Sequence, residues 1–326
     1  MQDREFALPE HVRPYSVNFN KQPRIKFVNP NVDNYKRNIE HASDLHRNHG
    51  YGMIQKDMLK GKAAVICGSG NTLGDEDVLD AIRKRQENGA LLVACKQAIK
   101  FLHDKGFKID YAVSMDPGAH IACPEKIYKA PGVKHIIASS SDPKLFDYLK
   151  DEEVLIFHSA CGVENEVKLY QDLFDNPDCM GGGYNVINRA LSAFLYMGCL
   201  PITLAGVDSG WRAGQSFYVD GTNNRPGVDM CDNGRVEMTQ AEQTLYRALS
   251  EKAANKHDLD EDEVALLGNL QLKVWHTRPD MLASAVALAQ VAKQYSEQDF
   301  EILGKVLPHS LRYKDEAFLK ECVSFQ

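Results

Sequence analysis

Short apolar runs alternate with longer amphipathic stretches between residues 62 and 208. Buried strands are predicted over 63–67, 90–95, 111–116, 133–140, 153–159 and 201–208. Helices are predicted between them over 75–88, 97–106, 143–151 and 187–198. Strands that alternate with helices predict an α/β fold, with a Rossmann-like, mostly parallel, doubly wound sheet and helices on both faces.

The segments before and after this region differ from it in their pattern of polar and apolar residues. Residues 1–58 are polar and contain four prolines, and we expect them to form an N-terminal extension with a helix over 34–47 that wraps the α/β domain of residues 59–220. Residues 221–326 begin with a Gly/Asn/Asp-rich loop at 221–236 and are expected to form a helical C-terminal region that completes the site. Its three helical patterns cover 239–256, 260–272 and 280–296.

Composition narrows the class of protein. The formal net charge of −7 provides no overall basic field for duplex DNA. The N-terminus lacks the apolar core of a secretory signal, and no run is long enough to cross a membrane. The eight cysteines form no C-x-x-C pair, which favours mostly buried thiols in a reducing compartment. We therefore expect a cytoplasmic protein, bacterial or virus-encoded.

The first strand runs into a glycine-flanked turn, Gly68-Ser69-Gly70-Asn71-Thr72, ahead of an acidic helix start. Two glycines let a backbone approach a ligand closely, and N–H groups at a following helix start can bind phosphate. A tight strand-to-helix turn without any ligand explains the same residues equally well.

Two further strands end in an acidic residue, Asp116 before Pro-Gly and Asp208 before Ser-Gly-Trp. The carboxyl ends of parallel strands share one edge of a sheet, where ligands bind in such folds. Both carboxylates are therefore candidates for catalysis, and an Asp that only caps a turn is the alternative for Asp116. Beyond Asp208, Arg212 is a candidate for pairing with a phosphate.

Two other stretches add candidates. Gly182, Gly183, Tyr184 and Asn185 form a second glycine-rich loop before a helix, where Asn185 also suits an N-cap. His276 precedes a helix near Pro279 and is the best single candidate for a general base, with His309 a weaker one. A structural histidine is the competing reading.

Several classes of enzyme are excluded by absent motifs. The chain has no G-x-x-x-x-G-K-[ST], no G-x-S-x-G and no H-E-x-x-H. It also has no His/Cys cluster with zinc spacing, and the first turn lacks the third glycine of a dinucleotide dehydrogenase. No metal site is predicted from these residues.

Three motifs in order resemble one family. The run from Ala63 to Pro117, with its GSGNTL turn and "IDYAVSMD", together with "GGGYNV" and "PITLAGVD", resembles the 6-hydroxymethylpterin diphosphokinase MptE-like family. That family includes the motility-associated factor glycosyltransferases, and is more distantly similar to bacterial sialyltransferases that use CMP-sialic acid. Two features depart from its pattern: Asn71-Thr72 replaces the usual Pro-Ser, and Phe217-Tyr218 stands where a histidine is frequent.

The resemblance implies roles for these positions. Gly68, Ser69, Gly70, Asn71 and Thr72 would hold the phosphate or ribose of a nucleotide donor. Gly182, Gly183, Tyr184 and Asn185 would close over that nucleotide. Asp116 would face donor or acceptor, and Asp208 would lie near the reaction centre. The base would be His276 or Asp116, unless Tyr218 takes the place of the missing histidine.

The sequence thus predicts a transferase with a nucleotide-activated donor, most simply a CMP- or UDP-type nucleotide sugar, and a hydroxyl acceptor. A glycan, a protein hydroxyl and a hydroxymethylated base all remain open as acceptor. One alternative is an ATP-dependent diphosphokinase that uses Mg²⁺ held by Asp116 and Asp208. The other is a non-catalytic protein that retains the fold.

Overall fold

The computed structural model describes residues 32–124, 127–159, 166–181, 185–210, 239–254, 259–271, 279–304 and 306–313. Within these ranges, nine strands form one sheet in the order β1-β6-β5-β4-β3-β2-β8-β9, with β7 paired to β6. The strands are β1 (Gly52–Met53), β2 (Ala64–Cys67), β3 (Leu91–Cys95), β4 (Tyr111–Ser114), β5 (Lys134–Ala138), β6 (Glu153–Ser159), β7 (Cys179–Met180), β8 (Ile202–Ala205) and β9 (Phe300–Ile302). Each pairing among them is parallel, which confirms the predicted α/β fold with a parallel sheet.

The helices fall where the apolar periodicity predicts them, with some additions. They are α1 (Val32–His49), α2 (Glu76–Glu87), α3 (Ala98–Asp104), α4 (Pro143–Tyr148), α5 (Glu166–Leu173), α6 (Val186–Tyr196), α7 (Gln240–Ala254), α8 (Glu261–Gln271), α9 (Pro279–Ala292) and α10 (Leu307–Arg312). The 3₁₀ helices η3 (Asn71–Gly74) and η4 (Ala119–Ile121) complete the set. The sequence pattern does not predict α5, α10, β1, β7 or β9, most of which are very short.

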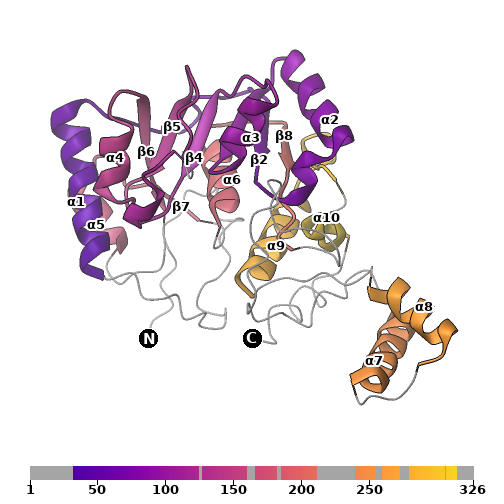
Figure 1. The fold of residues 1–326 in the computed structure, drawn as a ribbon. Helices are drawn as coiled ribbons and strands as arrows, with labels where there is room; N and C mark the ends of the chain where they lie inside the picture. Colours follow the sequence, from indigo (N-terminus) through magenta and orange to yellow (C-terminus); the bar gives the residue numbers. More distant parts are fainter. Residues whose placement is uncertain are drawn as a thin grey trace.

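The strands alternate their side chains between two apolar layers. In β2, Val65 and Cys67 pack with α2 and α3, whereas Ile66 packs with α6 on the other face. Figure 1 shows α2 and α3 on one side of the sheet and α6 behind it. The nearly continuous apolar strands of the sequence follow from this burial on both faces.

The strand order reverses at β2. The chain adds β3, β4, β5 and β6 successively on one side of β2, and then returns to place β8 on its other side. In open parallel sheets, ligands bind beyond the carboxyl ends of the strands at such a reversal. The turn after β2 and the loop after β8 therefore flank the expected ligand position.

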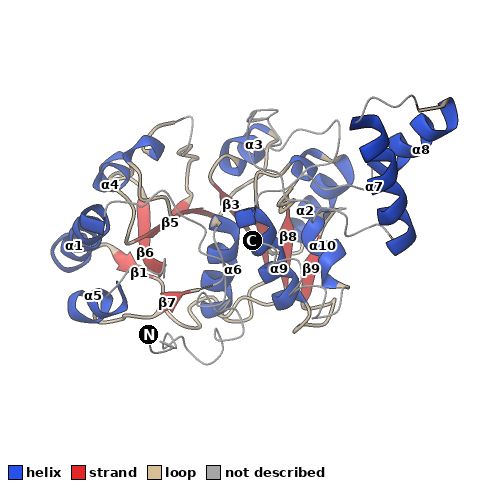
Figure 2. Ribbon diagram, turned by 90° about the horizontal axis from the view of Figure 1, so that it is seen from below, coloured by secondary structure: helices blue, strands red, loops and turns tan. Residues whose placement is uncertain are grey.

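Helix α1 covers the end of the sheet that β1 forms. Figure 2 shows α1, α4 and α5 gathered there, with α7 and α8 beyond the opposite end. In this layer Tyr35 and Ile39 pack with Phe146 and Tyr170. The buried Asn38 also ties α1 to two loops, since its amide nitrogen donates to the Ser140 carbonyl at 2.9 Å and the Pro117 carbonyl at 3.4 Å.

The C-terminal part of the chain contributes more to the sheet than helical patterns alone suggest. Strand β9 extends the sheet beyond β8, and α9 packs against α6 and α10. Helices α7 and α8 pack on each other through Leu249, Leu267 and Leu270. The three-part division of the chain at 58 and 220 stays a prediction, with β9 showing that the third part joins the sheet of the second.

No disulfide joins the cysteines in the described ranges. Cys67, Cys95, Cys179 and Cys199 are buried, and Cys123 is half-buried. Burial raises the pKa of the Cys95 and Cys199 thiols to about 12. These thiols pack as small apolar groups, as expected from their scattered positions.

A bilayer-spanning helix would need both length and sustained apolar character. No helix in the described ranges combines the two.

Asn38→Ala is expected to lower the free energy of unfolding by about 1–3 kcal/mol, because it removes a buried donor that bridges two carbonyls. Lys36→Ala on the same helix is the matched control, since the Lys36 side chain is 66% exposed and should change stability little. Denaturant unfolding measures both variants, and equal effects would contradict the bridging role of Asn38.

Candidate active site at the reversal of strand order

The turn after β2 packs directly against the loop after β8. The N–H of Gly68 donates to the Ala205 carbonyl at 2.8 Å, and that of Gly70 donates to the Gly206 carbonyl at 2.9 Å. A Cβ on Gly70 would stand 1.9 Å from Oδ2 of Asp208, and one on Gly68 would stand 2.5 Å from the Gly206 oxygen. Both glycines of the turn are thus required by the close approach of two backbone segments.

Asp208 is held by Thr72 in this contact. Its Oδ1 accepts from the Thr72 N–H at 3.3 Å, and its Oδ2 accepts from the Thr72 hydroxyl at 2.9 Å. The Thr72 hydroxyl therefore holds the Asp208 carboxylate, which explains why a hydroxyl residue stands at this position. Asn71 begins η3, directly after its N-cap Gly70, at a position where proline is also favoured.

The Asp208 side chain is only 4% exposed. Burial raises its pKa from 3.8 to about 6, and the hydrogen bonds from Thr72 oppose that rise. Since the folded pKa exceeds the unfolded one, the folded state binds more protons between about pH 4 and pH 6, and stability falls as the pH rises through this range. Above that range, the cost of the buried charge is constant.

This packing changes the expected chemistry of the turn. The N–H groups of Gly68, Gly70 and Thr72 donate to the β8 loop, and that of Leu73 donates to the Gly70 carbonyl. The following helix α2 begins with Glu76 and Asp77, whose charges occupy the favourable end of its dipole. These N–H groups already have partners, so phosphate binding by the turn stays a prediction that needs further donors. The tip of the turn, at Ser69 and Asn71, is half-buried and accessible to a base or ribose.

A second group of polar side chains follows β3, the strand beside β2, and β4, the next strand in the sheet. Lys96 follows β3, and its ammonium lies 3.4 Å from Oδ2 of Asp116, which follows β4. The other carboxylate oxygen of Asp116 accepts from the Gly118 N–H at 3.0 Å, as a turn-capping Asp does. His120 Nε2 lies 3.8 Å from the same carboxylate. Lys96 was not among the candidates from the sequence, although a charged residue at the end of a buried strand is the signal that identified Asp116.

Lys96 also has an unusual backbone. Its φ of +50° lies in the left-handed region, which costs a residue with a Cβ about 1–2 kcal/mol. Strain of this kind is found most often at functional sites.

The two predicted acidic residues do not come together. Strands β3 and β2 separate β4 from β8, so three interstrand spacings of about 4.8 Å lie between the two strand ends. Ligands of one Mg²⁺ must each approach it to about 2.1 Å, which this separation does not favour. In the described ranges, no three His, Cys, Asp or Glu side chains converge as a metal site would require. The strand order therefore does not favour Asp116 and Asp208 as ligands of one Mg²⁺, and any use of Mg²⁺ stays a prediction.

The start of α6 lies over the turn after β2. A Cβ on Gly68 would stand 3.0 Å from the Ile187 side chain, so helix and turn are in close contact. Asn185 is the N-cap, and its Oδ1 accepts from the Asn188 N–H at 2.9 Å. Asn185 therefore has the capping role that the sequence offered as the alternative to nucleotide binding.

The remaining predicted site residues lie outside the described ranges. They are Gly182, Gly183, Tyr184, Arg212, Tyr218 and His276. Their roles stay predictions. A direct role of Asp208 in the reaction also stays a prediction, because Thr72 donates hydrogen bonds to both of its carboxylate oxygens.

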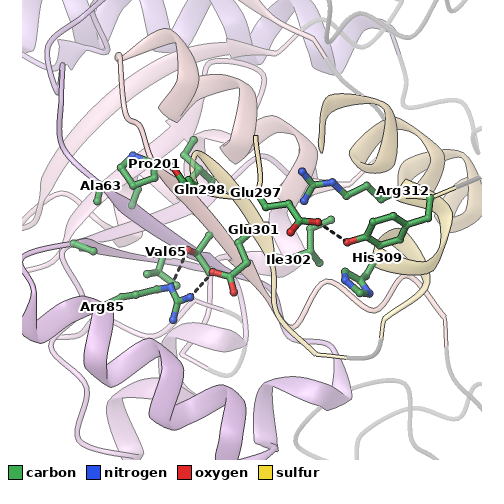
Figure 3. Close-up of a pocket in the computed structure, with 15 residues that line it drawn as sticks. Ala63, Val65, Arg85, Pro201, Glu297, Gln298, Glu301, Ile302, His309 and Arg312 are labelled. Atoms are coloured by element: carbon green, nitrogen blue, oxygen red, sulfur yellow. Dashed lines mark hydrogen bonds and ion pairs between the residues drawn. The ribbon is translucent and has the colours of Figure 1, made fainter. Parts of the chain in front are cut away.

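A hollow of about 460 Å³ lies at the opposite edge of the sheet, beside the amino ends of β2 and β8. Figure 3 shows its charged groups, including Arg85 beside Glu301. Arg85 donates to Glu301 and to the Thr203 hydroxyl, and Arg312 donates to the Phe300 and Tyr295 carbonyls. His309 also lines this hollow and not the carboxyl edge, so the structure does not support it as a base for that site.

Two histidines have strongly lowered pKa values for structural reasons. Burial lowers the pKa of His158 to about 3 and that of His135 to about 4. His158 stacks on Tyr170, its Nδ1 lies 2.9 Å from the Ser139 hydroxyl, and its Nε2 lies 3.1 Å from the Asn176 carbonyl. Both His158 and His135 are fully buried. We therefore read these two neutral histidines as part of the core.

Comparisons with known proteins agree with this fold. The family described as 6-hydroxymethylpterin diphosphokinase MptE-like matches residues 29–214, and the chain belongs to this family. Among solved structures, the fold is similar to that of the MAf glycosyltransferase from Magnetospirillum magneticum AMB-1, with a TM-score of 0.54 and 14% identity. The match covers 89% of this chain and 42% of that protein, so this chain spans less than half of its length. No curated protein matches the sequence.

Asp208→Asn is expected to raise stability at pH 7.5 by about 1–3 kcal/mol, because it removes a buried charge. The amide oxygen can still accept from the Thr72 N–H, and the amide NH2 can donate to the Thr72 hydroxyl. The variant should also lose the fall in stability that the wild type shows between about pH 4 and pH 6. Thermal unfolding from pH 4.5 to pH 7.5 measures both effects.

Thr72→Ser keeps the hydroxyl and is the control for that measurement, with a pH profile like that of the wild type. A destabilised Asp208→Asn at pH 7.5 would show that the carboxylate is favourable where it lies.

Gly70→Ala is expected to lower the free energy of unfolding by about 2–3 kcal/mol, since its Cβ would overlap the Asp208 carboxylate. Gly268→Ala in α8 is the matched control, because a Cβ there meets open space. The control should be neutral or slightly stabilising in denaturant unfolding. Similar values for both variants would rule out the tight contact of the turn.

Proposed function

We propose that this protein is a transferase that takes a group from a nucleotide-activated donor, most simply a CMP- or UDP-type nucleotide sugar, to an acceptor hydroxyl. The observation that carries the proposal is the reversal of strand order at β2 and β8, with the turn at Gly68–Thr72 at its carboxyl edge. Membership of the MptE-like family supports a nucleotide-dependent transfer. The similarity to a structure described as a glycosyltransferase favours a sugar as the transferred group.

The proposed chemistry uses the two groups of residues differently. The half-buried Ser69 and Asn71 at the tip of the turn would contact the base or ribose. The acceptor oxygen would bond to the activated carbon as the bond from that carbon to the phosphate oxygen breaks, and the nucleotide would leave with the electron pair. Asp116 would accept the acceptor proton, unless His276 provides the base.

A second candidate function follows from the description of the family, which names a diphosphokinase. In this case ATP would be the donor and diphosphate the transferred group. Such a reaction would depend on Mg²⁺, with ligands other than the pair Asp116 and Asp208, because the strand order separates them.

Titration calorimetry of the full chain with CMP-, UDP- and GDP-sugars and with ATP tests the proposal. We expect one pyrimidine nucleotide sugar to bind in the micromolar to millimolar range that is usual for enzyme substrates. The measurement is repeated with EDTA, because a diphosphokinase should lose ATP binding and turnover on metal removal.

Binding of ATP alone, and only with Mg²⁺, would favour the diphosphokinase. Failure of every member of the panel to bind would overturn both activities and leave a protein that retains the fold without the reaction.

A further inference from the structure

The turn after β2 provides few donors for an anion. The N–H groups of Gly68, Gly70 and Thr72 all donate to the segment that follows β8. The buried Asp208 adds negative charge beside the turn. A phosphate bound at this edge therefore needs a cation from a neighbouring strand.

Lys96 lies where such a cation is needed. It directly follows β3, the strand between β2 and β4, and Cys95 before it pairs with Val113 of β4. The side chain is 28% exposed, so its ammonium is sheltered yet accessible to a ligand.

The backbone of Lys96 has a conformation that lysine rarely adopts. Its φ of +50° is disfavoured for lysine, whereas glycine or asparagine adopts this conformation readily. Its carbonyl accepts from the Ile99 N–H at 3.0 Å at the entry to α3, so the strained residue is fixed at the strand end.

Asp116 orients the ammonium. The Gly118 N–H holds one oxygen of this carboxylate, and the other lies 3.4 Å from the Lys96 nitrogen. An ammonium has three N–H donors, so one contact to Asp116 leaves further donors for a second anion.

We propose that Lys96 is a substrate-contacting residue that binds the phosphate of the donor, between the turn after β2 and the carboxylate of Asp116. This inference rests on the proposed function and extends it, since it assigns recognition of the phosphate to β3 and not to the glycine turn. In the reaction, the ammonium would stabilise the charge that develops on the leaving phosphate oxygen.

The test compares Lys96→Asn with Lys100→Asn in the full chain. Asparagine tolerates the positive φ. Lys100 lies in α3, four residues after Lys96, with a side chain that is 57% exposed and has the same charge. Calorimetry is performed with the nucleotide sugar that binds the wild type, with its nucleoside monophosphate and with its nucleoside. Thermal unfolding of each variant is measured in parallel.

We expect Lys96→Asn to weaken binding of both phosphate-containing ligands at least tenfold, to leave binding of the nucleoside unchanged and not to lower the melting temperature. Lys100→Asn should leave all three affinities within twofold of the wild type, and Lys96→Arg should retain most of the phosphate affinity.

An unchanged affinity for the phosphate ligands in Lys96→Asn would overturn this inference and leave the proposed function standing. An equal loss for nucleoside and nucleotide, or a lower melting temperature, would also overturn it, since Lys96 would then only support the site. A wild-type chain that binds no nucleotide would overturn the proposed function, and this inference with it.

Discussion

Gly70 and the Asp208 carboxylate lie so close together that no other residue fits the turn, and the geometry of the candidate site follows from that contact. A Cβ at Gly70 would stand 1.9 Å from Oδ2 of Asp208 and 2.7 Å from the Gly206 oxygen. Thr72 then secures the carboxylate through its N–H and its hydroxyl. This contact connects the loops after β2 and β8, the two strands between which the strand order reverses. It therefore fixes the backbone beneath the position where a ligand would bind.

The same contact divides the edge of the sheet into two parts. On the β2 and β8 side, polar backbone groups are paired with each other, which makes the segment rigid and leaves only its tip for a ligand. On the β3 and β4 side, Lys96 and Asp116 remain partly exposed. Asn38 of α1 contacts the Pro117 carbonyl directly after Asp116, so the N-terminal helix supports the second part of the edge.

Much of the fold can be predicted from local patterns of apolar and polar residues. The apolar runs predict β2, β3, β4, β5, β6 and β8 because each is buried on both faces, and their alternation with helices predicts a parallel sheet. Strands β1, β7 and β9 have only two or three residues each, so local pattern carries almost no signal for them. Strand order depends on long-range packing, and it is the strand order that separates Asp116 from Asp208.

The sequence predicts where the candidate site lies in the fold, but not which side chains contact one another there. Gly68, Asp116 and Asp208 are recognisable because glycine or a carboxylate at a strand end is a local signal. That Thr72 would engage both oxygens of Asp208 is a contact across 136 residues, which no local pattern contains. Lys96 has a local signal, yet its positive φ and its position beside Asp116 appear only in three dimensions.

The electrostatics of this edge favour the same division of roles. With a pKa of about 6, Asp208 is ionised at neutral pH, and its burial means that water screens the charge poorly. A phosphate that bound at the turn alone would lie near the Asp208 carboxylate, and most of the turn N–H groups would already be donating to other partners. A phosphate placed one strand further along meets an ammonium that Asp116 orients, while the turn still reaches the rest of the nucleotide. The buried charge that fixes the turn is thus also the reason why a cation on β3 is needed.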